Sequence, residues 1–477
     1  MSATCDVAII GAGPAGLSAA GVLAGRGLDV RLLDENDHAG GQLMRHPPAG
    51  SSGSGRYLFD GARRRGFRLM ARLAHRGVAI VQGVQVLGIF PENRLLVHRS
   101  DGRVLELAAR CIVCASGARE RFIPFPGWTL PGVIATGAAQ ILLKTSGMLP
   151  AASTLVAGSG PLPLLLARQL VAHGGRVKAL MMHSPAPAGR HALRMLPRHA
   201  GKLAEGVWLT ASLALAGVPI GFNRRIVEAA GRGRLEAVTV ARVDRHGGVV
   251  RGSLKTIPAD GLAVGFGFAP NIELLQQAGC EAVYRSDRGG WVVRTDRNLE
   301  TSVANLFAAG EVTGVAGGVK SFIEGQLCGL AVLDRLGMAT KTAAGAAERR
   351  RLLRQRDHEL NFGALVNRLC RVPAHWVATI PDDTLICRCE DVHMGDLRQR
   401  LGQGFDTPGA LKKATRCGMG ICQGRICGAI VADILDVLAA GRETFCREPL
   451  TIRSPVKPVP LGALAAMERL HPEDPLP

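Results

Sequence analysis

Apolar and polar positions follow two different periods along the first third of the chain. Residues 6–10 and 30–34 are short apolar runs typical of buried strands, and they flank a Gly-rich turn and an Ala- and Leu-rich helical stretch. Residues 78–110 alternate as half-buried strands do, and residues 111–117 predict a buried strand that ends in Ser-Gly. This succession predicts a doubly wound α/β fold.

A second strand, turn, helix and strand begin at residue 153 and continue to about residue 183. Short strands and turns are expected over 205–300, followed by a strand, a Gly-rich turn and a helix over 304–337. Two such units, one inserted into the other, predict two dinucleotide-binding (Rossmann-like) domains. We assign residues 1–150 with 255–340 to the first domain and residues 151–254 to the second.

The rest of the chain predicts a linker, a small module and a tail. Residues 56–76 and 343–372 have the basic pattern of surface helices, and residues 50–55 that of a flexible loop. We expect a helical linker over 341–380, a compact helical module with six cysteines over 381–446, and an extended Pro-rich tail over 447–477.

Composition narrows the functional classes. A hydrophobic content of 47% and a charged content of 20% exclude a mainly disordered chain. The net charge of +19 suggests an anionic ligand or an acidic partner, but no nucleic acid, because no basic run is interleaved with aromatic residues. No apolar run could span a membrane and no signal peptide is apparent, so the twelve cysteines indicate reduced thiols or metal ligands. We expect a cytoplasmic protein, with peripheral contact to the inner membrane left open.

The first Gly-rich turn carries a dinucleotide fingerprint. Gly11, Gly13 and Gly16 form G-x-G-x-x-G directly after an apolar strand, with Pro14 and Ala15 between the last two. The first glycine permits the tight turn, the second lets a pyrophosphate approach the backbone, and the third lets helix and strand pack closely. The N-terminus of the following helix supplies N–H donors for the phosphates.

Acidic and Gly-rich positions later in the chain extend this candidate site. Asp34 lies 18 residues after Gly16 at the end of the next strand, where a carboxylate accepts hydrogen bonds from the adenosine ribose, and Glu35 follows it. The other candidate cofactor contacts are Gly41, Gln42, Ser116, Gly117, Gly310 and Glu311.

This combination resembles the flavoproteins with two dinucleotide-binding domains, the class of thioredoxin reductase and glutathione reductase. The resemblance covers residues 5–337 and implies FAD. The class usually has Asp at its last motif position, and Glu311, one methylene longer, should still reach the ribityl chain. The motifs that carry the resemblance are the opening fingerprint, Gly40-Gly41-Gln42, Ala115-Ser116-Gly117-Ala118 and Phe307-Ala-Ala-Gly-Glu311.

The second Gly-rich turn departs from the fingerprint. Gly158 and Gly160 are present, but Pro163 stands where a third Gly or an Ala is usual. The strand that follows ends at His183 without an acidic residue, although nearby basic side chains could favour a 2′-phosphate. We therefore expect a retained structural domain more than a working NAD(P)H site, with ATP as another nucleotide it could hold.

Seven of the twelve cysteines predict no chemistry. Cys111 and Cys114 form a C-x-x-C, but positions i and i+3 of a strand face opposite sides of a sheet, about 10 Å apart. That separation is too large for a disulfide, so both are expected in the core. The isolated cysteines, expected in the core or on the surface, are Cys5, Cys280, Cys328, Cys370 and Cys446.

The cysteines of residues 385–428 can converge on one point, and thiolates suit an iron–sulfur cluster or zinc. The stretch resembles the small, helical bacterioferritin-associated-ferredoxin-like 2Fe–2S domain over about residues 384–440. The resemblance implies a 2Fe–2S cluster on Cys387, Cys389, Cys422 and Cys427. That family ends in C-x-x-C where this chain has C-x4-C, so Cys417 is a rival for one place, and zinc or no metal remain alternatives.

Residues 264–270 and 455–464 extend the resemblance to nearly the whole chain. Together these features resemble the FAD-containing alpha-type subunits of heteromeric amine dehydrogenases, which include opine oxidase and hydrogen cyanide synthase subunits. The family implies an electron-transfer subunit for the oxidation of a secondary amine or amino acid, with a quinone or dye-like acceptor. It also implies a beta subunit with its own FAD, and leaves open a small ferredoxin-like gamma subunit and FMN at the interface. The alternative is a self-contained NAD(P)H-dependent flavin and iron–sulfur reductase.

Overall fold

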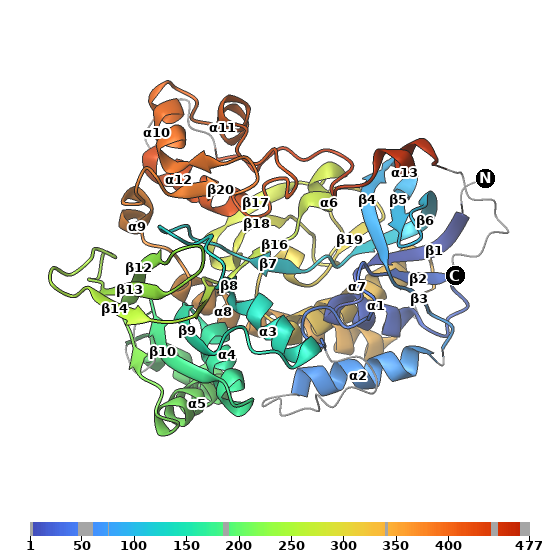
Figure 1. The fold of residues 1–477 in the computed structure, drawn as a ribbon. Coiled ribbons are helices and arrows are strands. Elements are labelled where there is room, and N and C mark those ends of the chain that lie inside the picture. Colours follow the sequence, from blue (N-terminus) through green and yellow to red (C-terminus); the bar gives the residue numbers. More distant parts are fainter. Residues whose placement is uncertain are drawn as a thin grey trace.

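The computed structural model describes residues 3–45, 61–74, 76–184, 190–338, 342–439 and 447–467. The predicted loop 50–55 and Cys446 lie outside the described residues. Figure 1 shows two sheet-containing bodies, an orange C-terminal module above the body that contains β9 and β10, and a red tail that runs from the module toward the other body. The α/β class with two Rossmann-like units is confirmed.

The first sheet has the parallel centre of a dinucleotide-binding domain. Strands β3, β2, β1 and β6 run parallel in this order, β5 and β4 continue antiparallel, and β19 joins β6 in parallel. The strand β19 comes from the part of the chain that follows the second domain. Its place in the first sheet agrees with a second domain inserted into the first. The strands are β1 (Ala3–Ile10), β2 (Val30–Leu33), β3 (Ala79–Val81), β4 (Val84–Phe90), β5 (Arg94–Arg99), β6 (Val104–Cys114) and β19 (Leu306–Ala308).

Helices α1 (Pro14–Leu23) and α7 (Gly318–Arg335) pack tightly against each other on one face of this sheet, and α2 (Gly61–Ala74) lies beside α1 (Figure 1). Glycine makes the approach possible, because a Cβ at Gly325 would lie 2.1 Å from the carbonyl oxygen of Ala15. Cys111 belongs to the core on this face and Cys114 to the core on the other, which confirms that the two thiols point apart.

The second sheet is parallel throughout, in the order β11-β10-β9-β15-β8. Strands β8 and β15 come from the segments predicted for the first domain, so sheet membership crosses those boundaries. A three-stranded antiparallel sheet, β12-β13-β14, projects beside it. The strands are β8 (Val133–Ala135), β9 (Ser153–Gly158), β10 (Arg176–Met182), β11 (Ile220–Gly221), β15 (Gly261–Gly265), β12 (Arg224–Ala230), β13 (Ala237–Arg242) and β14 (Lys255–Pro258).

Helices α3 (Thr136–Ser146), α4 (Pro161–Ala172) and α5 (Arg190–Leu215) accompany the second sheet. Strands were expected from residue 205, and this expectation is wrong for 205–215, where α5 continues. The reason is the helical spacing of apolar positions, since Leu209 and Leu213 are both buried against α4 and β10.

Short elements join the two bodies. Antiparallel strands β7 (Ala118–Glu120) and β16 (Phe268–Pro270) lie where the chain passes between them. The remaining elements of this region are α6 (Glu273–Gln277), β17 (Ala282–Arg285), β18 (Gly290–Val293) and the short 3-10 turns Pro91–Asn93, Ser286–Arg288 and Glu311–Thr313.

The segment predicted as a linker contains the long helix α8 (Ala343–Leu369), and a small hairpin accompanies the helices of the module. The tail is not extended throughout, because it contains the short helix α13. The C-terminal elements are α9 (Ala374–Ala378), β20 (Leu385–Cys387), β21 (Val392–His393), α10 (Met394–Gly402), α11 (Pro408–Thr415), α12 (Gly428–Leu438) and α13 (Leu461–Ala465). Among the described helices, none is long and apolar enough to cross a membrane.

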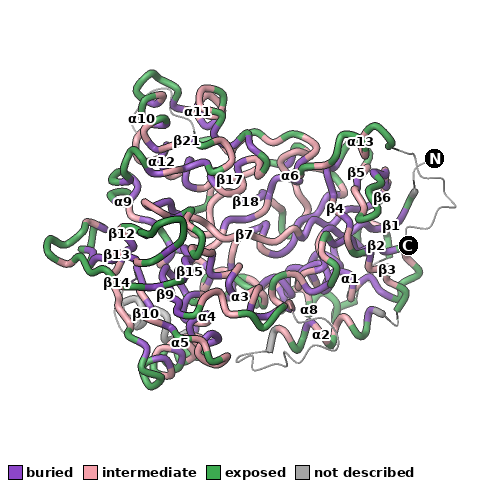
Figure 2. The backbone as a smooth tube through the Cα atoms, viewed as in Figure 1, coloured by how far each residue is buried: buried purple, intermediate pink, exposed green. Residues whose placement is uncertain are grey.

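One continuous core joins the second domain to the module. Buried side chains of β9 and β15 share a cluster with those of α9, β20 and α12. Figure 2 shows the corresponding buried backbone running from the second sheet into the module. The module is therefore packed onto the second domain and does not hang on a free linker.

Two helical glycines predict opposite effects of the same substitution. Gly325→Ala should destabilise the protein by about 1–3 kcal/mol, because its methyl group would collide with α1. Gly206→Ala in α5 meets nothing within 4 Å and should stabilise the protein by about 0.5–1 kcal/mol. Urea unfolding of both variants measures the difference, and equal effects would contradict the packing described for α1 and α7.

Candidate functional site

The first Gly-rich turn has the geometry that its fingerprint predicts. Gly11 has a φ of +97°, and a Cβ there would lie 2.5 Å from the carbonyl oxygen of Ala115. A Cβ at Gly16 would lie 1.9 Å from the carbonyl oxygen of Gly11. Pro14 opens α1 at its first turn, where a missing N–H costs nothing. The N-terminus of α1 is thus held directly at the end of β1.

The two acidic residues after β2 differ in their surroundings. Asp34 is buried, and its carboxylate accepts from the Ala12 backbone N–H at 2.6 Å and from the Asn36 backbone and side-chain N–H groups. It therefore reaches the fingerprint turn. The neighbouring Glu35 instead forms an ion pair with Lys457 of the C-terminal tail.

The later candidate residues lie around the same turn. A Cβ at Gly41 would lie 2.9 Å from the Cα of Gly13, and Gln42 accepts from Arg45 nearby. A Cβ at Gly310 would lie 2.9 Å from the Cβ of Ala15. The structure therefore gathers segments from residues 11–16, 34, 41 and 310 at one end of the first sheet.

Ser116 and Gly117 lie at the crossing between the two domains. The Ser116 hydroxyl donates to the carbonyl oxygen of Asn271 at 2.7 Å, and the Asn271 amide returns a bond to Ser116 at 2.9 Å. The backbone N–H of Asn271 also donates to Gly117. These hydrogen bonds join the segment after β6, in the first sheet, to the segment after β16, which follows the second sheet in the chain.

Glu311 bonds the turn that precedes α7. One carboxylate oxygen accepts from the backbone N–H groups of Ala316 and Gly317, at 3.3 and 2.9 Å. Burial raises the pKa of Glu311, although Lys320 and these N–H groups oppose the shift. Its other oxygen is the group that can meet a cofactor hydroxyl.

Sequence reasoning missed the buried pair Lys320 and Glu324. The Lys320 ammonium is fully buried and donates to the carbonyl oxygens of Gly310 and Gly314 at 2.6 and 3.0 Å. Glu324, 2.8 Å away, accepts from the backbone N–H of Gly310. A Lys and a Glu four residues apart on a helix carry no signal of burial in the sequence, because such pairs usually lie on exposed faces.

Five cysteines gather at one end of the C-terminal module. The thiols of Cys387, Cys417 and Cys427 lie within 4.8 Å of one another, and all three residues are buried. The pKa of Cys387 lies far below its usual range because Cys417 and Cys427 donate to its sulfur. The Cys389 and Cys422 thiols contact each other at the half-buried edge of the group.

Local structure explains this convergence. Cys387 ends β20, and the turn into β21 brings Cys389 beside the loop 416–427. A Cβ at Gly420 would lie 2.3 Å from the Cβ of Cys389, so glycine lets the two segments meet. Cys427 is the N-cap of α12. The cysteines among the described residues form no disulfide in this structure.

The cysteine loop is bonded to the strand that joins the domains. Arg119 of β7 donates to the carbonyl oxygen of Arg425 at 2.8 Å and pairs with Glu273 at 2.6 Å. Arg425 in turn donates to the carbonyl oxygen of Cys422. Next to it, Arg121 and Asp433 of α12 form an ion pair. The strand β7 begins one residue after Gly117. The loop 416–427, which carries three of the cysteines, is therefore hydrogen-bonded to the segment in which the chain leaves the first domain.

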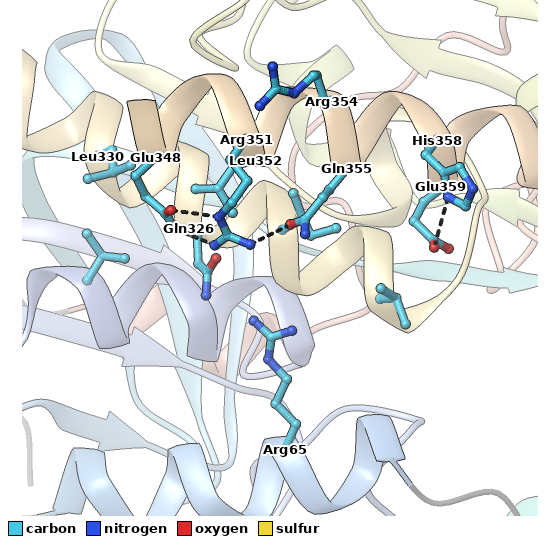
Figure 3. A pocket seen from close by; sticks show the side chains of 13 residues that line it. Arg65, Gln326, Leu330, Glu348, Arg351, Leu352, Arg354, Gln355, His358 and Glu359 are labelled. Atoms are coloured by element: carbon cyan, nitrogen blue, oxygen red, sulfur yellow. Dashed lines mark hydrogen bonds and ion pairs between the residues drawn. The ribbon is translucent and has the colours of Figure 1, made fainter. Parts of the chain in front are cut away.

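A cavity of about 710 Å³ lies elsewhere, between α1, α7 and α8 with Arg65 of α2 at its edge. Figure 3 shows Arg65 pointing toward the wall formed by Gln326, and Arg351 bonded to Glu348. Burial and the Arg351 charge lower the pKa of Arg65. None of the candidate cofactor or cysteine residues lines this cavity.

Comparison with known proteins identifies the family to which this chain belongs. Residues 5–345 match the family of pyridine nucleotide-disulphide oxidoreductases. The chain belongs to this family. It is thus an oxidoreductase, and the fold of the family implies FAD. Residues 382–468 match the sarcosine oxidase A3 domain. The 2Fe–2S assignment of the module stays a prediction.

Full-length relatives of this oxidoreductase are subunits of larger enzymes. It is 34% identical to hydrogen cyanide synthase subunit HcnB of Pseudomonas aeruginosa, over 95% of this chain and 97% of that protein. It is also 34% identical to an opine oxidase subunit from Rhizobium meliloti, over 96% and 98%. The crystal structure of L-proline dehydrogenase from P. horikoshii shares the fold, with a TM-score of 0.70, 22% identity and coverage of 97% and 79%.

A buried carboxylate near the domain crossing has an unusual environment. Glu120 of β7 accepts from the backbone N–H of Gly137 at 2.7 Å, while its other oxygen is buried without a hydrogen-bond partner in the described part of the chain. Burial raises the pKa of Glu120 to about 7. The carboxyl group is therefore protonated more readily in the folded protein than in the unfolded chain.

Stability of this oxidoreductase should fall as pH rises from about 4.5 to about 7, as far as Glu120 contributes. A raised pKa means that the folded state binds more protons in this window, so its advantage is present at low pH and lost above pH 7. Glu120→Gln should flatten this dependence in urea titrations at several pH values. The exposed Glu281→Gln is the control and should retain it; an unchanged slope in Glu120→Gln would contradict the assignment.

Proposed function

We propose that this oxidoreductase is the FAD- and 2Fe–2S-containing electron-transfer subunit of a heteromeric dehydrogenase. The enzyme would oxidise a secondary amine or amino acid of the opine, proline, hydroxyproline or glycine type and deliver electrons to a quinone or dye-like acceptor. The observation that carries the proposal is the five-cysteine group bonded, through Arg119 and Arg425, to the crossing strand beside the predicted flavin contacts. The names of the full-length relatives support an enzyme of this kind.

The flavin would be held by the turn at the end of β1. Backbone N–H groups at the start of α1 would hold the pyrophosphate, Asp34 the ribose, and the second carboxylate oxygen of Glu311 the ribityl chain. Bound FAD exchanges electrons in pairs or singly, and an iron–sulfur cluster exchanges them singly. The polypeptide itself orients the cofactors and keeps them at a fixed separation.

The cysteines can be divided between the two sides of a cluster. Cys389 interacts with Cys422 and Cys387, while Cys427 interacts with Cys387, Cys417 and Cys422. Cys387 and Cys427 belong to the buried group with Cys417, and each also interacts with one cysteine of the outer pair, Cys389 and Cys422. We propose that Cys387, Cys389, Cys422 and Cys427 hold the cluster, with Cys417 as a buried thiol beside it.

Anaerobically purified protein should contain iron and acid-labile sulfide in equal amounts, and no stoichiometric zinc. Cys427→Ser should lose both, because a ligand is removed, whereas Cys417→Ser should keep them. Metal analysis and low-temperature electron paramagnetic resonance measure the outcome. Retention of iron in Cys427→Ser together with its loss in Cys417→Ser would reject this ligand set, and stoichiometric zinc without sulfide would reject the cluster.

The function is tested by combining the chain with a candidate FAD-dependent, amine-oxidising beta subunit. An opine, proline or sarcosine should bleach the flavin of this chain in the complex and support dye reduction, but should not bleach the isolated chain. Cys427→Ser in the same complex should retain bleaching of the beta-subunit flavin and lose most of the dye reduction. Substrate-dependent bleaching of the isolated chain would contradict the division of labour between subunits.

A further inference from the structure

The carboxyl edge of the second sheet is covered by the chain itself. Strands β9, β10 and β15 end side by side at Gly158, Met182 and Gly265. In open α/β sheets, nucleotides bind just beyond such strand ends, with their phosphates at the N-terminus of the following helix. The end of α8 and the helix α9 lie across all three strand ends.

The phosphate-binding turn is the first part that this segment covers. A Cβ at Gly160, at the N-terminus of α4, would lie 2.7 Å from the Cys370 sulfur and 3.7 Å from a methyl group of Val366. A Cβ at Gly267, just after β15, would lie 3.0 Å from the Cβ of Cys370. Glycine thus admits a side chain of α8 here, at the point where it would otherwise admit a pyrophosphate.

The far end of the cleft holds an indole ring. Trp376 of α9 lies 5.0 Å from the His183 ring at the end of β10 and 5.3 Å from the Phe266 ring after β15. The Arg225 guanidinium lies over the same indole at 5.0 Å. Trp376 is 1% exposed, so its ring is closed off from solvent.

The charge states of His183 and Arg225 agree with a cleft that is filled by Trp376. Burial, and then the Arg225 charge, lower the pKa of His183 to about 4, so its imidazole is neutral at physiological pH. The Arg225 charge is directed at the indole of Trp376. An adenosine phosphate entering here would have to displace a packed aromatic group, and the residue that follows β10 is His183 and not an acidic residue.

We propose that residues 366–376 fill the coenzyme cleft of the second domain as a built-in occupant. Cys370 takes the place of the phosphates and Trp376 that of the adenine ring. The domain thereby becomes the seat of the cysteine module, whose core is continuous with Trp376 and Val377. NADH and NADPH are thereby excluded from this cleft. This inference does not depend on which metal the module binds.

The direct test is coenzyme binding by the purified full-length chain. Equilibrium dialysis with NADH and with NADPH, up to millimolar concentration, should detect no saturable binding. Anaerobic addition of either coenzyme should leave the visible flavin band unchanged. Saturable binding that slows alkylation of Cys370, or bleaching by either coenzyme, would overturn the proposal.

Alkylation of Cys370, followed by peptide mass spectrometry, reports on the segment independently of coenzymes. In the wild type, Cys370 should react with iodoacetamide far more slowly than the half-buried Cys422 of protein freed of metal. Trp376→Ala should accelerate Cys370 alkylation at least tenfold, whereas the aromatic Trp376→Phe should leave it near the wild-type rate. Buried Cys328 in α7 is the internal control for global unfolding. If Trp376→Ala leaves both cysteines protected, the indole does not hold the segment and the proposal fails.

Discussion

The ion pair between Arg121 and Asp433 ties the cysteine module to the strand that joins the two nucleotide domains. Both side chains are largely buried, at 16% and 15% exposure, so each charge depends on the other. Removing one partner of such a pair typically costs about 3–5 kcal/mol, because the remaining charge is left uncompensated. Arg119, two residues earlier, bonds the cysteine loop to the same strand. The position of the five thiols relative to the first domain therefore rests on two arginines, Arg119 of β7 and Arg121 directly after that strand.

In this chain the second nucleotide domain carries the cysteine module. The family's two nucleotide domains are retained, yet the second cleft contains Cys370 and Trp376, and the module packs where a diffusible coenzyme would enter. A fixed internal group replaces a ligand that binds and leaves. The arrangement suits an electron carrier whose donor is another protein, in agreement with relatives named as subunits of opine oxidase and hydrogen cyanide synthase.

The tail adds a second connection between the same regions. Val456 is buried and bonded to β4 through the Leu87 carbonyl, while Arg425 donates to the Val456 carbonyl. The next residue, Lys457, pairs with Glu35 beside the predicted ribose site. The segment that the composition predicts to be an extended tail therefore connects the loop 416–427 to the region of the first Gly-rich turn.

The sequence alone determined the features that depend on local chemistry. Glycines at 11, 13 and 16, the acid at 34 and the clustered cysteines require particular residue types at short spacings, so they could be recognised without coordinates. Only the tertiary structure decided what lies across the second cleft, where Trp376 meets His183 from nearly two hundred residues away. It also decided that Lys320 and Glu324 are buried, and that Cys417 joins the inner thiols. These contacts depend on long-range packing between faces, and a linear pattern of apolar and polar residues does not specify which faces meet.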